Sequence, residues 1–223
     1  MCLHTYHQTM EILIATSRSY LAVVPQWAAQ YLSDNDISTC WQLPLYHRPS
    51  IVVYGTVTPQ PRDVGFFSDE SEGYYYSGKL MASQPLTDST TTILSEVNQY
   101  LGTHFNGILV NCYRDGNDKL GAHSDSEVGL DKSTKMVAGI AFGAVRTFRI
   151  RYINNCPPDI VVSSSVDRRT PTSTIVADIP HHEGMLLVMA GDFQDEFTHE
   201  IPPITTNKVN TPRLSLTFRS HAS

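Results

Sequence analysis

Cysteine is scarce in this sequence, and long hydrophobic runs are absent. The four cysteines, Cys2, Cys40, Cys112 and Cys156, lie far apart and form no Cys-x-x-Cys pair, so the sequence indicates neither a disulfide framework nor a structural zinc site. The apolar stretch at residues 10–24 is too short and too interrupted for a signal peptide or a membrane span. We therefore expect a soluble, intracellular protein with reduced thiols and no membrane partner, in the nucleus or the cytoplasm.

Positive charge is also in deficit. The chain has 16 Lys and Arg against 22 Asp and Glu, a net charge of -6. Proteins that coat nucleic acid need clustered Lys and Arg for phosphate contacts, so this balance argues against that class. An enzyme with a local basic rim is compatible with it, and residues 146–151 and 168–169 could form either such a rim or ordinary solvated faces.

The most informative stretch, residues 111–125, ends in His123-Ser124-Asp125. On an extended strand, residues two apart point the same way, so His123 and Asp125 can converge on one point. They would supply two thirds of a non-haem Fe(II) site, which needs two histidines and one carboxylate on one face of the metal. If this stretch is a metal site rather than a solvated loop, another histidine must complete it.

A second pattern lies near the C-terminus, where residues 213–219 read Arg-Leu-Ser-Leu-Thr-Phe-Arg. On a strand, Arg213 and Arg219 share one face with the two hydroxyl residues between them, and the three apolar residues share the other. Inward-pointing arginines without an anion are costly, so this face suits a dicarboxylate, whose oxygens match the fork of each guanidinium. The alternative is an edge strand with solvated arginines.

The order of these motifs carries a family resemblance. Along the chain stand Asn-x-Tyr at 111–113, Asp-Gly at 115–116, His-x-Asp at 123–125, a distant His199, and the arginine strand at 213–219. This order and these spacings resemble the AlkB family of Fe(II)- and 2-oxoglutarate-dependent dioxygenases. The upstream segments 48–50, 61–63 and 73–78 resemble the substrate side of the branch that repairs alkylated nucleic acid. The resemblance covers most of the chain, about residues 44–220.

The resemblance implies Fe(II) as cofactor and 2-oxoglutarate and O2 as cosubstrates. The implied metal ligands and catalytic residues are His123, Asp125 and His199. The implied 2-oxoglutarate contacts are Asn111, Tyr113, Arg213 for the distal carboxylate, and Arg219 near the metal-side carboxylate. Among the nine histidines, His199 stands shortly before the arginine strand, where the family has its distal ligand, and His182 is the alternative.

The resemblance also implies a substrate, an alkylated base in DNA or RNA. Tyr74 and Tyr76, with the side of His123, would sandwich the base, and the polar contacts at its edge would come from Arg62, Ser77 and Glu127. The expected reaction is oxidative demethylation of bases such as N1-methyladenine and N3-methylcytosine, releasing succinate, CO2 and formaldehyde. Without the resemblance, residues 74–76 would be read as an ordinary strand with core rings.

Two other functions are compatible with parts of the pattern. A 2-oxoglutarate-dependent hydroxylase of a protein or small molecule would keep the iron and cosubstrate residues but would not need the segment at 74–77. A non-catalytic binding module would not need the metal ligands. The segment at 204–210 has one lysine, where family members that act on duplex DNA have a basic cluster, so the choice between single and double strands, and between DNA and RNA, stays open.

Periodicity predicts the elements around these motifs. Helices are expected at 25–32 and 93–101, and strands at 108–111, 135–142, 145–153, 174–179, 185–189 and 214–219, with 135–142 and 145–153 pairing around Gly143. Several short strands with Gly, Pro and Asp turns indicate an antiparallel sandwich or jelly roll. Residues 154–172 have loop composition and are expected to form an exposed excursion.

We therefore predict a β-rich α+β protein, a double-stranded β-helix (jelly roll) braced by N-terminal helices. Its 223 residues suit one continuous domain with a full core. The expected parts are an N-terminal helical segment packed on the core at 1–43, a substrate-recognition lid and bracing helix at 44–104, and the dioxygenase jelly roll at 105–223. We expect a monomer.

Overall fold

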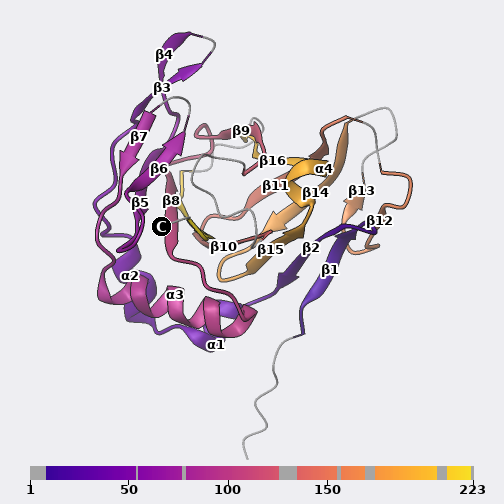
Figure 1. The fold of residues 1–223 in the computed structure, drawn as a ribbon, viewed down its shortest axis with the longest axis horizontal. Coiled ribbons are helices and arrows are strands. Elements are labelled where there is room, and N and C mark those ends of the chain that lie inside the picture. The colour runs from indigo at the N-terminus through magenta and orange to yellow at the C-terminus, as the bar shows by residue number, and fades with distance from the viewer. Residues whose placement is uncertain are drawn as a thin grey trace, which may run out of the picture.

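The computed structural model describes residues 9–53, 55–76, 79–125, 135–154, 157–168, 174–204 and 210–221. Two antiparallel sheets form its centre (Figure 1). The larger has eight strands in the order β12-β1-β2-β15-β10-β17-β8-β5. Their bounds are β1 (Glu11–Ala15), β2 (Ser19–Val24), β5 (Asp63–Phe67), β8 (Gly107–Tyr113), β10 (Met136–Gly143), β12 (Val161–Val162), β15 (Leu186–Gly191) and β17 (Arg213–Arg219).

The smaller sheet has five strands in the order β13-β14-β11-β16-β9. Their bounds are β9 (Leu120–His123), β11 (Arg146–Tyr152), β13 (Asp167–Arg168), β14 (Ile175–His181) and β16 (Phe197–Ile201). Two hairpins form separate two-stranded sheets. They are β3 (Ser50–Val53) with β4 (Thr56–Pro59), and β6 (Gly73–Tyr76) with β7 (Lys79–Ala82). The inner faces of the two sheets share one buried apolar cluster, to which Val137 and Leu187 contribute from the large sheet and Phe148 and Ile150 from the small one. This arrangement is the predicted jelly roll, which the structure confirms.

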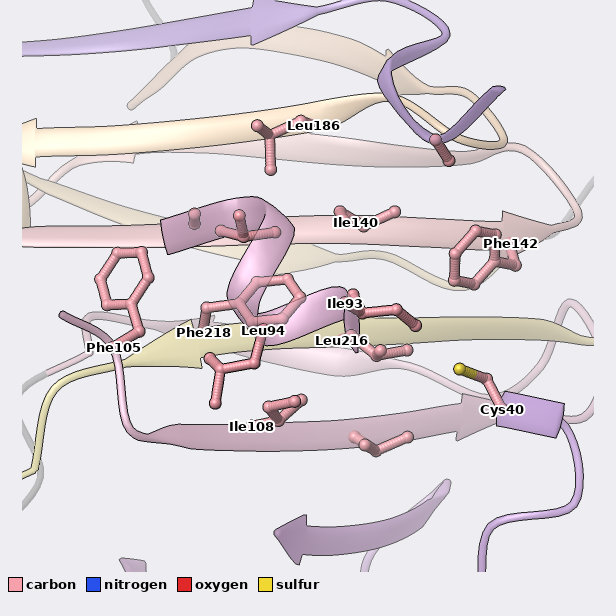
Figure 2. Packing of buried hydrophobic residues seen from close by; sticks show 14 of the residues in the cluster. Cys40, Ile93, Leu94, Phe105, Ile108, Ile140, Phe142, Leu186, Leu216 and Phe218 are labelled. Carbon is pink, nitrogen blue, oxygen red and sulfur yellow. The ribbon is translucent and has the colours of Figure 1, made fainter. Parts of the chain in front are cut away.

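The helices cover the outer face of the large sheet (Figure 1). They are α1 (Trp27–Tyr31), α2 (Asp34–Cys40) and α3 (Asp88–Leu101), while α4 (Phe193–Glu196) lies between β15 and β16. Helix α3 begins at the capping residue Thr87, whose side chain accepts from the Thr90 N–H, and ends at Gly102 in the left-handed conformation. Figure 2 shows its apolar residues, Ile93 and Leu94, packed among strand residues such as Leu216 and Phe218.

The side chains of β17 alternate between its two faces as the sequence predicts. Leu214, Leu216 and Phe218 lie in the cluster beneath the helices. Their neighbours Arg213 and Arg219, with Ser215 and Thr217 between them, line the cavity between the two sheets. One strand thus supplies the core on one face and polar groups to the interior cavity on the other, because successive side chains of a strand point in opposite directions.

Three expectations about local structure were wrong. Strands β10 and β11 do not pair around Gly143 but belong to different sheets, because the chain crosses between layers there. Gly143 has a φ of +81°, and a Cβ would lie 2.4 Å from the Pro212 carbonyl oxygen, so the crossing requires glycine. The excursion at 154–172 contains two short strands, β12 and β13, which extend the sheets. The expected N-terminal helical segment begins with strands β1 and β2 of the large sheet.

Candidate metal centre

The structure brings together His123, Asp125 and His199, each offering one ligand atom, with these atoms all within 4.8 Å of one another. His123 ends β9, and His199 lies opposite it on β16 in the antiparallel register. The Nε2 atoms of His123 and His199 lie 3.6 and 3.7 Å from the two carboxylate oxygens of Asp125. The alternative ligand His182 is exposed and is not part of this group.

The sequence predicts that His123 and Asp125 lie on one strand, and the structure contradicts this prediction. Strand β9 ends at His123, and Asp125 follows in a bend. The bend is held by Gln194 of α4, whose Oε1 accepts from the Asp125 backbone N–H at 2.8 Å. Asp125 Oδ1 accepts from Arg219 Nη2 at 2.7 Å, whereas its Oδ2 is buried and has no hydrogen-bond partner among the described residues. One carboxylate oxygen is therefore fixed by an arginine and the other is left for a cation.

The histidines present ring nitrogens toward the same point. His123 Nδ1 lies 2.9 Å from the Gly121 carbonyl oxygen; since a carbonyl accepts, Nδ1 carries the hydrogen, and Nε2 is the ring atom that faces Asp125. Burial lowers the pKa of His199 to about 3, with help from the nearby His123, and the ring stacks on Phe148 at 5.1 Å. Burial alone would raise the pKa of Asp125, but Arg219 and the two histidines hold it well below its usual range. A neutral His199 beside an ionised Asp125 is the state that a divalent metal needs in these two ligands.

The arginine strand places two guanidinium groups in different surroundings. Arg219 pairs with Asp125, but Arg213 has no ion pair among the described residues. Arg213 is 2% exposed, and its Nε and Nη1 atoms have no hydrogen-bond partner in that part of the chain. Burial lowers its pKa to about 10, so the group is charged at neutral pH. A buried, charged fork with unused donors is suited to an anion such as a ligand carboxylate.

Strand β8 supplies the other predicted cosubstrate contacts. Asn111 and Tyr113 lie opposite Ser215 and Arg213 of β17 and line the same cavity as the three metal-site residues. The guanidinium of Arg213 lies over the Tyr113 ring, 5.3 Å from its centre. Asn111 Oδ1 accepts from Arg62 Nε at 2.7 Å. The predicted cosubstrate residues are therefore gathered around one cavity next to the metal ligands.

Of the predicted substrate contacts, Arg62, Tyr74 and Tyr76 lie at the junction of that cavity with an adjoining pocket of about 330 Å³ beneath the two hairpins. Tyr74 is buried, with its ring 5.8 Å from Phe66 and 5.9 Å from Tyr76, and with Arg219 over its face at 5.1 Å. Tyr76 is half-buried and forms the outer ring of this stack. Ser77 and Glu127 lie outside the described residues, as do residues 205–209 of the segment with one lysine.

The sequence gives no signal for three residues that complete the site. Gln194 holds the Asp125 backbone from a four-residue helix. Phe148 stacks on His199 from the neighbouring strand. His181 contacts Arg213 through its Nδ1 atom at 3.1 Å. None of the three belongs to a sequence motif. Each contacts a site residue that is distant along the chain and is brought close only by the fold.

The residues present fit a divalent metal, because two imidazoles and a carboxylate offer ligand atoms at close range and one carboxylate oxygen is buried without a hydrogen-bond partner among the described residues. A family model described as the 2OG-Fe(II) oxygenase superfamily matches residues 20–219. The chain belongs to this superfamily. Fe(II) and 2-oxoglutarate are therefore the cofactor and cosubstrate of the site.

The chain is similar in sequence to AlkB-like oxygenases. It is 30% identical over 169 residues to the human protein named DNA oxidative demethylase ALKBH2, an alignment that covers 76% of this chain and 60% of that protein. It is 32% identical over 163 residues to mouse alpha-ketoglutarate-dependent dioxygenase alkB homolog 3, covering 73% of this chain and 52% of that protein. The alignments thus span between half and two thirds of these curated relatives.

A solved structure, that of OsALKBH1, matches in fold with a TM-score of 0.58 at 15% identity, covering 90% of this chain and 97% of that one. This likeness supports the jelly-roll assignment. Among the described residues, none of the helices has both the length and the apolar composition that crossing a bilayer requires.

Proposed function

We propose that the protein is an Fe(II)- and 2-oxoglutarate-dependent dioxygenase that removes alkyl groups oxidatively from bases in nucleic acid. The observation that carries the proposal is the junction of two sites in one cavity. The group His123, Asp125 and His199 lines the same cavity as Arg213, and that cavity shares Tyr74 and Tyr76 with a second pocket. The first part suits a metal with a dicarboxylate, and the second has room for a base.

His123, Asp125 and His199 would hold the metal, and β8 and β17 would hold the cosubstrate. In this assignment Arg213 binds the distal carboxylate of 2-oxoglutarate, and Asn111 and Tyr113 supply hydrogen bonds beside it. When bound, Fe(II) allows O2 to oxidise 2-oxoglutarate to succinate and CO2 and to hydroxylate a C–H bond of the substrate. The protein contributes a fixed ligand geometry, a fixed charge for the dicarboxylate and a cavity that limits access of water.

The substrate proposal rests on the tyrosine rings that line both the cavity and the second pocket. Tyr76 is backed by Tyr74, at an interplanar angle of 12°, so its position is set before any ligand arrives. A planar base could stack on Tyr76 and reach the side of His123, which lines the same cavity. Arg62 is buried at the junction of both pockets and already donates to Asn111, so it would link the bound base to the cosubstrate residues.

The chemistry of an N-methyl substrate follows from this placement. Hydroxylation of the methyl carbon gives a carbinolamine, which breaks its C–N bond to release formaldehyde and the unmodified base. For each turnover, one O2 and one 2-oxoglutarate are consumed, and one succinate, one CO2 and one formaldehyde are formed. The names of the relatives agree with this activity, since ALKBH2 is called a DNA oxidative demethylase.

Formaldehyde release tests the proposal directly. Matched single- and double-stranded DNA and RNA oligonucleotides with N1-methyladenine or N3-methylcytosine would be incubated with Fe(II), 2-oxoglutarate and ascorbate. We expect release that requires 2-oxoglutarate, that is lost in His199→Ala, and that persists in the matched control His182→Ala, which changes an exposed histidine. Succinate formation without formaldehyde from any oligonucleotide would contradict the nucleic-acid substrate and favour a protein or small-molecule hydroxylase. Turnover retained in His199→Ala would contradict the metal site.

A further inference from the structure

The two arginines of β17 differ in the groups that their guanidinium groups contact. Arg219 Nη2 donates to a carboxylate, that of Asp125, at 2.7 Å. Arg213 Nη2 contacts a ring nitrogen instead, His181 Nδ1 at 3.1 Å, and both residues are buried. The same strand therefore carries one guanidinium whose charge is matched within the protein and one whose charge is not matched by any described residue.

The tautomer of His181 follows from its two partners. Its Nε2 lies 3.1 Å from the Met185 carbonyl oxygen. A carbonyl can only accept and a guanidinium can only donate, so Nε2 carries the hydrogen and Nδ1 is a lone-pair acceptor for Arg213. Burial and the charge of Arg213 lower the pKa of His181 to about 3, so the ring is neutral in the physiological range.

The local chain fixes this imidazole before any ligand binds. His181 ends β14, and the turn that follows brings the Met185 carbonyl back to the ring. Gly184 in that turn has a φ of +70°, and its N–H donates to the Ala141 carbonyl of β10 in the other sheet. Both ring nitrogens are thus engaged, and the position of Nδ1 is set by the backbone rather than by Arg213.

We propose that His181 is the positioning residue for 2-oxoglutarate: it holds the Arg213 guanidinium through one N–H without neutralising it and leaves the remaining N–H groups for the distal carboxylate. This inference rests on the proposed function, because it assigns that carboxylate to Arg213. A carboxylate in the place of His181 would orient the guanidinium equally well but would cancel the charge that attracts the ligand. A neutral acceptor provides orientation while the cavity stays positive.

The test compares two ligands that differ only in the carboxylate that Arg213 would bind. 2-Oxoglutarate has a distal carboxylate, and 2-oxobutyrate keeps the keto acid but lacks that group. Dissociation constants for both would be measured by calorimetry, without O2, on Fe(II)-loaded wild type, His181→Leu, His181→Gln and His181→Glu. His182→Leu is the matched control, since it changes the adjacent, exposed histidine in the same way.

We expect His181→Leu to weaken 2-oxoglutarate binding about tenfold or more, since one oriented hydrogen bond to a charged group is lost. Binding of 2-oxobutyrate should change less than about twofold, and His182→Leu should leave both ligands unaffected. His181→Glu should weaken 2-oxoglutarate about a hundredfold through ion pairing with Arg213, whereas His181→Gln, which keeps a neutral acceptor, should restore most of the affinity.

The outcomes distinguish a failure of this inference from a failure of the proposed function. Equal losses for both ligands in His181→Leu, or unchanged 2-oxoglutarate binding, would overturn the positioning role. If His181→Leu does not fold by circular dichroism, the isosteric pair His181→Gln and His181→Glu decides, and equal 2-oxoglutarate affinities in these two would overturn it. Wild-type protein that binds 2-oxoglutarate no better than 2-oxobutyrate would instead overturn the assignment of the distal carboxylate to Arg213.

Discussion

Replacing Arg213 with methionine should stabilise the ligand-free protein and abolish its response to 2-oxoglutarate. Two donors of the buried guanidinium, Nε and Nη1, have no partner among the described residues, and each buried unsatisfied donor costs about 1–3 kcal/mol. Methionine removes both and fills a similar volume. The change leaves His181 Nδ1 unpaired, at about 1–3 kcal/mol, and loses the contact with the Tyr113 ring, about 0.5–1 kcal/mol. We expect a net gain of about 1–3 kcal/mol in the free energy of unfolding, in the range seen when buried charges are replaced by apolar groups.

Scanning calorimetry of the metal-loaded protein, with and without 2-oxoglutarate, measures both effects. For a chain of this size, 1 kcal/mol shifts the unfolding temperature by about 2–4 °C. At a hundred times the dissociation constant, 2-oxoglutarate should stabilise the wild type by about 2.7 kcal/mol, and Arg213→Met by nothing measurable at the same concentration. A lower unfolding temperature of ligand-free Arg213→Met would refute the reasoning, because the guanidinium would then be stabilised by the protein alone. A ligand shift retained in this variant would refute the assigned role.

Three further changes test other parts of the site. Tyr76→Ala should weaken binding of a single-stranded oligonucleotide with N1-methyladenine about 5- to 100-fold, by loss of one stacking surface, and fluorescence anisotropy would show whether it does. Gln194→Leu removes the acceptor of the Asp125 N–H and should weaken Fe(II) binding about 10- to 100-fold. An unchanged calorimetric affinity would mean that the bend at Asp125 does not depend on Gln194. Asp118→Asn should lower the free energy of unfolding at pH 7 by about 1–3 kcal/mol. Burial alone would raise the pKa of Asp118, but hydrogen bonds from Arg114 outweigh it and hold the pKa below its usual range. The stabilisation by the Asp118 carboxylate is therefore present above the unfolded pKa of about 3.9 and is lost as the pH falls through the lower folded pKa. Denaturant unfolding would be measured at pH 7 and below pH 3. The difference in the free energy of unfolding between wild type and Asp118→Asn should be smaller at the lower pH.

Much of the fold is predictable because several elements of the two sheets and their bracing helices have regular patterns. The alternation in residues 213–219 gave both faces of β17 correctly, and α3 was recognised from its apolar spacing and Gly102. The pairing of β10 with β11 was not predictable in this way. A glycine between two strands is compatible with a hairpin or with a crossing between layers, and contacts far along the chain, such as that of the Ala144 N–H with the Pro212 carbonyl, accompany the crossing.

The short strands were missed for a related reason. Strands β12 and β13 have two residues each and are strands only because they pair with β1 and β14. Local composition in such segments is that of a loop, and no periodicity can develop over two residues. Strands β1 and β2 are also absent from the predicted elements, because a short apolar run does not by itself distinguish a strand from a buried helix.

The sequence by itself determined which chemical groups the site contains. The order of the motifs and the period of two on β17 place His123, Asp125, His199 and the two arginines in one family pattern, because these features depend on neighbours in the chain. The tertiary structure decided how each group is held. It set His199 opposite His123 through the register of β9 and β16, and it gave one arginine a carboxylate partner and the other a neutral imidazole. Those partners are tens of residues away along the chain, so their contacts depend on strand order and register, which local periodicity does not specify.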